Sequence, residues 1–234
     1  MLTSFYTAAV GAIAQQNGID VSANNISNIS TNGYKADENV FADLLHTNIH
    51  ADGNDNLKTG HGTKLGAVDT VFTQGSLQNT GRSLDYALGD ANTFFAIRTS
   101  DGSIRYTRNG AFSKSMEANG KTYLSDNNGG YVLDAAGKPV VITNEEEKQN
   151  IGVYSFGNLD GLLKSGDNYY RATNVSGNAH NVKNANIKQG CLESSSADMA
   201  TEMSNIITSE RAFDFNAKVV QISDEIMQTV NNLR

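Results

Sequence analysis

Apolar or small residues near the N-terminus recur at alternating steps of three and four, with Gln16 as the polar interruption. The same spacing returns near the C-terminus, where Glu210 and Asp224 interrupt it. The two series are Leu2, Phe5, Ala9, Ala12, Ile19, Ala23 and Ile26, and Met199, Met203, Ile206, Phe213, Ala217, Val220 and Met227. Because this spacing gives each helix one narrow apolar stripe, it predicts a coiled-coil seam. We therefore expect long helices over residues 3–29 and 195–231 that pack together.

The C-terminal segment also carries a second apolar stripe, displaced by about 100° around the helix from the first. Its members are Ala212, Phe215, Val219, Ile222, Ile226 and Leu233. One partner helix cannot cover both stripes, and soluble monomers rarely leave large apolar surfaces exposed. The pattern therefore predicts that neighbouring copies of the chain cover the remainder.

Between the helices the hydrophobic period changes to two, which is typical of strands. The expected strands are 93–98, 104–107, 131–133, 140–142 and 151–154, and the turn pairs between them include Asp101-Gly102, Asn109-Gly110, Gly129-Gly130 and Ala136-Gly137. Glycine after Asp, Asn or another glycine favours tight hairpin turns. We expect a compact β-rich domain over residues 68–186.

The predicted fold class is therefore α+β, with terminal helices packed as a coiled coil, an extended connector and a central β-rich domain. We assign residues 1–34 and 195–234 to the helical assembly domain, and residues 35–67 and 187–194 to the connector. Residues 41–45 favour a helical turn, whereas the segment Asp52-Gly53-Asn54-Asp55-Asn56 is typical of a loop.

Composition removes several classes of function. The 234 residues carry a net charge of −7, which gives no electrostatic reason to bind nucleic acid or an anionic membrane. The N-terminus lacks the basic region and unbroken apolar core of a cleaved signal peptide, and no apolar run is long enough to span a membrane. Cys191 is the single cysteine, so an intrachain disulfide is impossible. We expect it to be a small buried hydrophobic residue.

Candidate chemical sites are weak. His46 and His50 have the i, i+4 spacing of helical metal ligands, but no third ligand follows. Asp52, Asn54 and Asn56 resemble the start of a calcium loop, whose later glycine and glutamate are missing. The glycines of segment 60–66 do not match a phosphate-binding pattern, and we expect a flexible entry to the β domain. We predict no catalytic group, metal or cofactor.

One segment that spans the end of the first helix carries a family resemblance. Residues 23–35 read Ala-Asn-Asn-Ile-Ser-Asn-Ile-Ser-Thr-Asn-Gly-Tyr-Lys. This closely resembles the signature of bacterial flagellar rod and hook proteins, with Ser27 in place of the usual alanine. The signature positions are Ala23, Asn24, Asn25, Asn28, Gly33, Tyr34 and Lys35.

Later blocks follow in the order that the family shows. Segments 74–77, 80–88 and 94–95, then 106–112, are similar to its middle blocks. Gln189-Gly190-Cys191-Leu192-Glu193 resembles Gln-Gly-x-Leu-Glu, and 208–213 with 224–225 and 231–233 resembles the last helix. Ser195-Ser196-Ala197-Asp198 departs from the usual Ser-Asn-Val-Asp. The resemblance therefore covers nearly the whole chain.

The resemblance implies a structural subunit of the basal-body rod that assembles into a helical, torque-transmitting tube. It implies export without a cleaved signal through the flagellar export apparatus, and a place in the rod as it crosses the periplasm or cell wall. Partners would be further copies, other rod proteins and the hook protein, with a surrounding ring bushing as a further candidate. One β domain between terminal helices is similar to the distal rod type, with the proximal rod or a hook-like subunit as the alternative.

Two other classes of function stay open on the residues alone. A β-domain hydrolase would need a convergent pocket with a perturbed carboxylate, histidine or thiol. A monomeric binding module would need the terminal helices to satisfy each other within one chain.

Overall fold

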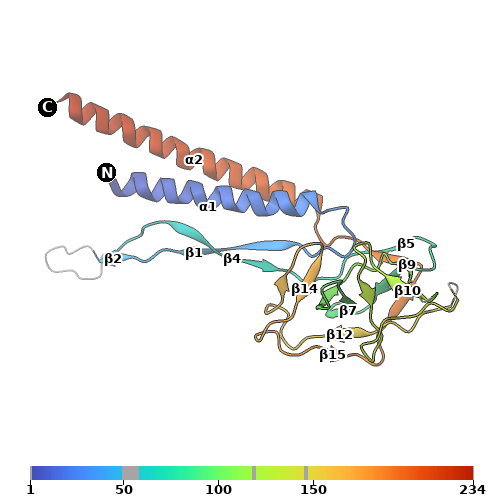
Figure 1. Cartoon of the computed structure of the whole chain (residues 1–234). Helices are drawn as coiled ribbons and strands as arrows, with labels where there is room; N and C mark the ends of the chain where they lie inside the picture. The colour runs from blue at the N-terminus through green and yellow to red at the C-terminus, as the bar shows by residue number, and fades with distance from the viewer. Residues whose placement is uncertain (1, 49–57, 118–119, 145–146, 234) are drawn as a thin grey trace. The chain divides into compact units, whose positions relative to one another are not determined.

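A computed structural model describes residues 2–48, 58–117, 120–144 and 147–233 (Figure 1). The chain divides into two compact units: the first contains the ranges 1–27, 37–69 and 198–234, and the second contains 28–36 and 70–197. Long helices belong to the first unit, and the second is rich in β-strands. The predicted α+β class, with terminal helices and a β-rich middle, is confirmed.

Helices α1 (Leu2–Ser27) and α2 (Met199–Asn232) lie side by side and run antiparallel in the first unit (Figure 1). Asn25 is hydrogen-bonded to Glu202. Gly18 lies next to Ser209, and Gly11 lies next to Asn216. Each step of seven residues along α1 is thus matched by seven residues back along α2.

The helix ends differ slightly from the prediction. Helix α1 stops two residues before residue 29, and α2 starts four residues after residue 195. Asp198 caps α2, because its carboxylate accepts a hydrogen bond from Thr201 N at 3.0 Å. Ser196 is outside the helix, and its hydroxyl accepts a hydrogen bond from Ala36 N at 2.9 Å. A side chain that takes a backbone donor in this way competes with helix formation.

Strands β1 (Asp37–Asp43) and β4 (Thr63–Thr70) pair with each other, as do β2 (Thr47–Asn48) and β3 (Lys58–Thr59). The predicted helical turn at 41–45 is therefore wrong, since 41–43 belong to β1. The expected flexible segment 60–66 is also wrong in part, since it enters β4 at Thr63. Pairing supplies the reason: Thr63 Oγ1 donates to Ala42 O at 3.1 Å, and the Phe41 ring lies beside Gly18 of α1.

The second unit is built on an antiparallel sheet. Its main path runs β13 (Leu163–Lys164), β14 (Tyr169–Arg171), β8 (Ile104–Thr107), β7 (Thr93–Arg98), β11 (Tyr131–Val132), β10 (Thr122–Ser125) and β9 (Ser113–Met116). Strand β12 (Val153–Ser155) pairs with β7 and with β15 (His180–Asn181). Shorter pairs join β6 (Tyr86–Leu88) to β16 (Ile187–Gln189) and β5 (Leu77–Asn79) to β17 (Cys191–Glu193).

Strand β7 forms the centre of the hydrophobic core. Phe95 and Ile97 belong to one buried cluster, and Phe94 and Ala96 belong to another. Successive side chains of a strand point to opposite faces, so β7 is buried on both sides. This explains why residues 94–97 form a continuous apolar run instead of alternating with polar residues.

Two sequence predictions in this unit are corrected. Residues 140–142 do not form a strand: Val141 makes an isolated bridge to Tyr123, and Pro139, which is bridged to Leu133, has no N–H to extend a ladder. Asn109-Gly110 is not a hairpin turn, because Gly110 packs tightly against the backbone of Tyr86. By contrast, Gly102, Gly129 and Gly137 have the positive φ angles that tight turns require.

Neither α1 nor α2, the helices of the described chain, combines the length and apolarity that crossing a bilayer requires.

Candidate assembly surface and signature cluster

Helix α1 meets α2 through small and polar residues. The buried positions of α1 are Ala8, Gly11, Ala14, Gly18, Ser22 and Asn25. A Cβ atom built on Gly11 would lie 2.9 Å from Asn216 Nδ2, so the two helices approach closely at this point. Small residues permit such close packing but bury little apolar surface each. Most large apolar side chains of the two helices therefore lie outside the centre of the contact between them.

Many of those large side chains are exposed. On α1, Tyr6 and Ile13 are exposed by 63% and 62%. The second stripe of α2 is also uncovered: Phe215, Val219, Ile222, Ile226 and Leu233 are between 41% and 84% exposed, and Ala212 is half-buried. An apolar surface of this extent on a folded unit is typical of an interface with another protein.

Part of this exposure comes from a difference in helix length. With Gly11 opposite Asn216, α1 continues nine residues toward its end at Leu2, whereas α2 continues sixteen residues to Asn232. The last turns of α2 therefore extend beyond α1 (Figure 1). Ile226, Met227 and Val230 lie in this overhang, and each is more than 40% exposed.

The predicted seam residues occupy intermediate positions. On α1, Phe5, Ala9, Ala12, Ile19 and Ile26 are half-buried and Ala23 is exposed, while the side chain of Leu2 is outside the described part. On α2, Ile206, Phe213, Ala217 and Val220 are half-buried, and Met199, Met203 and Met227 are exposed. The α1 series thus flanks the small-residue contact with α2 instead of forming its centre, and its role in assembly stays a prediction.

Within the signature, Asn25 joins three segments of the first unit. Its Nδ2 donates to Glu202 Oε1 at 2.8 Å and to Asp37 O at 2.8 Å, and its Oδ1 accepts from Asp37 N at 2.9 Å. Asn25 has no exposed surface, and Glu202 is 7% exposed. The amide therefore connects α1 both to α2 and to the start of β1.

At the other end of the signature, Lys35 lies in a buried charged cluster of the second unit. Lys35 Nζ is 2.7 Å from Glu193 Oε1, and Arg108 Nε is 2.8 Å from Glu193 Oε2. Arg108 Nη1 also donates to Thr93 O at 2.7 Å, and Lys35 Nζ donates to Thr73 O. The side chains of all three charged residues are fully buried. Three separate family blocks therefore meet at one carboxylate.

The protonation behaviour of the cluster follows from this geometry. Burial lowers the pKa of Lys35 below its usual range, and the charge of Glu193 offsets only part of that effect. Burial alone would raise the pKa of Glu193, but hydrogen bonds and charge from Arg108 and Lys35 outweigh it and lower the pKa. Glu193 is therefore ionised at neutral pH, as a partner of two cations should be.

The remaining signature residues shape the chain between these two points. Gly33 has φ +68°, a conformation that side chains disfavour, and an added Cβ would press on the backbone of Arg108. Tyr34 is buried, with Lys164 Nζ 5.0 Å from its ring centroid. Asn28 Oδ1 accepts from Thr31 Oγ1 at 3.2 Å. The first two signature residues, Ala23 and Asn24, are exposed.

Sequence reasoning placed Arg108, Glu193 and Glu202 in recognisable segments without giving them a role. Arg108 belongs to the block 106–112 and Glu193 to the block 189–193. Charged residues are usually solvated, so nothing in a single sequence indicates that these are buried. For Arg108 and Glu193, only the family blocks that contain them could have directed attention to them.

The two weak metal-site patterns, for which we predict no metal, lie only in part within the described residues. His46 Nε2 lies 3.4 Å from Asp43 Oδ2, and His50, Asp52, Asn54 and Asn56 are outside the described part. Among the described residues, no group of three or more His, Cys, Asp or Glu side chains is placed to hold a metal. Cys191 is half-buried in β17.

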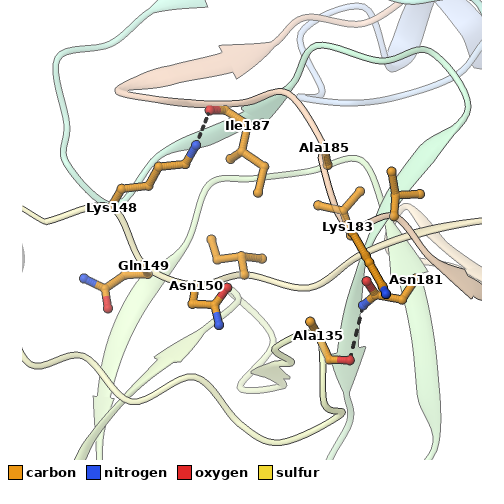
Figure 2. Close-up of a pocket in the computed structure, with 11 residues that line it drawn as sticks. Ala135, Lys148, Gln149, Asn150, Asn181, Lys183, Ala185 and Ile187 are labelled. Carbon is orange, nitrogen blue, oxygen red and sulfur yellow. Dashed lines mark hydrogen bonds between the residues drawn. The ribbon is translucent and has the colours of Figure 1, made fainter.

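A pocket of about 430 Å³ opens in the second unit (Figure 2). Ile151 and Val153 belong to its lining, together with Lys148 and Lys183. Lys148 Nζ donates to Ile187 O at 3.0 Å, as Figure 2 shows. The lining offers ammonium and amide groups but no carboxylate, thiol, hydroxyl or imidazole side chain. It lacks the acid–base pair or activated nucleophile that the alternative of a hydrolase requires.

Comparisons with family models match three segments of the chain to flagellar proteins. Residues 5–35 match the model described as flagella basal body rod protein. Residues 90–160 match the flagellar hook protein FlgE/F/G D1 domain, and residues 188–233 match the flagellar basal body rod FlgEFG protein C-terminal model.

Full-length relatives carry the same description. The flagellar basal-body rod protein FlgG of Bacillus subtilis (strain 168) is 31% identical over 265 aligned positions that cover all of both chains. The protein of the same name from Agrobacterium fabrum is 33% identical, over 96% of each chain. That of Borreliella burgdorferi is 30% identical, over 100% of this chain and 99% of the relative. By identity over its full length, the chain belongs to the flagellar basal-body rod proteins, a family of structural proteins of the flagellum.

Proposed function

We propose that this rod protein polymerises into a helical tube through the apolar faces of α1 and α2 that their mutual packing leaves uncovered. The observation that carries the proposal is the exposure of the second stripe of α2. Phe215 is 68% exposed and Ile222 is 54% exposed, although α2 is already paired with α1. A monomeric binding module would be expected to bury this stripe within one chain.

Association through these faces is energetically reasonable. Fully burying one Phe, Ile, Met or Val side chain contributes about 1.5–3 kcal/mol. Several such side chains per subunit would offset the loss of translational and side-chain freedom on binding. The α2 stripe and the faces of α1 are different surfaces, so the contact joins unlike patches. Contacts of this type form a ring where the rotation between copies closes and a helical assembly where it does not, and we propose the helical case.

The proposed packing mode is a coiled coil. The seven-residue steps that relate Gly11, Gly18 and Asn25 to Asn216, Ser209 and Glu202 support this mode. Seam residues such as Phe5, Ile19 and Ile26, half-buried within one chain, would then complete their burial against neighbouring copies. Stiffness of the tube would follow from many such contacts in parallel.

For the place in the flagellum we propose the distal rod, with the proximal rod or a hook-like subunit as the alternative. The full-length relatives named FlgG support the former. Partners would be further copies, other rod proteins, the hook protein and a surrounding ring. We propose export through the flagellar apparatus and a purely structural role. Electron microscopy of basal bodies from a deletion strain tests the position: loss of the distal rod alone supports it, and loss of the whole rod contradicts it.

The assembly proposal is tested with Phe215→Asp and Ile222→Asp in the full chain. A charge on this face should raise the concentration at which the protein sediments as a polymer by at least about tenfold, because each buried charge costs several kcal/mol. Met116→Asp is the matched control, since Met116 is 76% exposed in the second unit. Equal polymerisation of all variants, or a wild-type chain that stays monomeric at high concentration with both helices ordered, would refute the proposal.

A further inference from the structure

The small-residue face of α1 does not by itself determine the register of the two helices. Gly11 and Gly18 occur seven residues apart and face Asn216 and Ser209. If α2 shifted by seven residues, about 10 Å, Gly18 would face Asn216 as Gly11 does now. Gly11 would then face Ser223, a side chain smaller than Asn216. Such a face tolerates the shift, since glycine accepts either neighbour without steric conflict.

Asn25 is the position of α1 that does not tolerate this shift in register. Its amide donates to Glu202 Oε1 at 2.8 Å inside the contact, where Asn25 is fully buried. The same amide exchanges two hydrogen bonds with the backbone of Asp37, so its orientation is fixed from outside the helix pair. A buried, oriented amide that meets one carboxylate distinguishes one register from the others.

Both possible shifts break this contact. A shift that brings Gly11 opposite Ser223 places Asn25 opposite Ser209, and Glu202 moves beyond the last residue of α1. The opposite shift places Glu202 opposite Gly18, where a buried carboxylate would have lost its amide donor. An unsatisfied buried donor or carboxylate is costly, so either shifted register is penalised.

We infer that Asn25, acting with Glu202, is the residue that sets the register of α1 against α2. The register determines the position of the exposed α2 stripe along the helix axis relative to Tyr6 and Ile13 of α1. A neighbouring copy that contacts both helices can fit only one such relative position; this last step rests on the proposed function. Asn25 is thus a positioning residue for assembly, while the small residues on the same face of α1 allow the two helices to approach closely.

Disulfide trapping in the full chain tests the inference at concentrations below assembly. In a Cys191→Ala background, Gly11→Cys with Asn216→Cys reports the observed register, and Gly11→Cys with Ser223→Cys reports the shifted one. The Asn25→Leu/Glu202→Leu variant removes the amide and its carboxylate acceptor together, so no charge is left unpaired in the contact between the helices and they should still pair. It also removes the two hydrogen bonds of Asn25 to the backbone of Asp37. We expect the ratio of shifted to observed cross-link to rise by about tenfold or more.

The matched control is Glu202→Gln, which keeps an acceptor for Asn25 Nδ2 and should leave the ratio unchanged. Far-UV circular dichroism verifies that each variant retains its helices, and Asn25→Ala provides a second variant with the same expected change. An unchanged ratio in helical Asn25 variants would overturn the inference. Because cross-linking is read on monomers, failure of polymerisation would contradict the proposed function alone.

Discussion

Lys35 Nζ lies 2.7 Å from Glu193 Oε1, and neither side chain has any exposed surface. Lys35 ends the signature segment, which begins in the last turns of α1, whereas Glu193 ends the strand β17 that precedes α2. The pair therefore joins, inside the second unit, the two places where the chain leaves and re-enters the helices. Arg108 from the end of β8 completes the cluster on the other carboxylate oxygen.

Replacing Lys35 should destabilise the second unit strongly. Lys35→Met removes one cation and leaves the buried Glu193 with Arg108 alone, so we expect a loss of about 3–5 kcal/mol in the free energy of unfolding. Urea denaturation followed by tyrosine fluorescence measures it. Lys188→Met, at an exposed position of β16, is the control and should change stability little. If the two variants were equally stable, the cluster would not hold this unit together.

Acid should weaken the same cluster. The folded-state pKa of Glu193 is below its ordinary value of 4.5, so the unfolded chain binds the proton more readily. The stabilisation is then fully present above the unfolded pKa and is lost as the pH falls through the folded pKa. We expect the advantage of the wild type over Glu193→Gln to be constant near neutral pH and to shrink below about pH 4.5. Urea midpoints at successive pH values measure this, and an advantage that grows in acid would contradict it.

The helices and the β-rich middle could be predicted because large apolar residues carry a clear period. Phe213 and Val220 follow the seam spacing of α2, and strands β7 and β8 appear at the predicted residues 93–98 and 104–107. Both patterns come from side chains whose burial dominates local structure.

The face by which α1 meets α2 could not be predicted in the same way. Its buried residues, among them Gly11, Gly18 and Asn25, have little or no hydrophobic signal. The spacing of the larger residues Phe5, Ile19 and Ile26 beside them therefore predicts the seam at those positions instead. In the proposed assembly these larger residues would contact other copies of the chain, which a single sequence does not display.

Buried charge was equally hidden. Lys35, Arg108 and Glu193 are far apart in the sequence, and each alone resembles a solvated surface residue. The prediction of a helical turn at 41–45 fails because it rests on neighbouring residues alone. Residues 41–43 instead pair with β4, which begins about twenty residues later in the chain. Long-range pairing of this kind overrides weak local preference.

Close backbone packing at Gly110 gives a third prediction. A side chain there would overlap the carbonyl oxygen of Tyr86, whose amide in turn donates to Gly110 O at 3.0 Å. Because backbone cannot move aside easily, Gly110→Ala should cost about 3 kcal/mol or more. Gly157→Ala is the control, since an added Cβ at Gly157 meets nothing within 4 Å. Thermal melts of both variants measure the difference, and similar melting temperatures would argue against the packing described.

The uneven distribution of charge gives the last prediction. The first unit has 13 acidic and 5 basic residues, a net charge of −8, whereas the second has 12 and 13, a net charge of +1. If assembly brings first units of many copies together, their negative charges repel one another, and this repulsion is screened by salt. We expect polymerisation, followed by light scattering, to be faster in about 0.2 M than in about 0.01 M sodium chloride.

Neutralisation separates this charge effect from a general effect of salt on apolar contacts. Asp224→Asn/Glu225→Gln removes two exposed carboxylates from α2 and should allow polymerisation at a lower salt concentration than the wild type needs. Glu117→Gln in the second unit should leave the salt dependence unchanged. A wild-type rate that does not depend on salt, or a neutralised variant that needs more salt, would show that repulsion between the first units does not limit assembly.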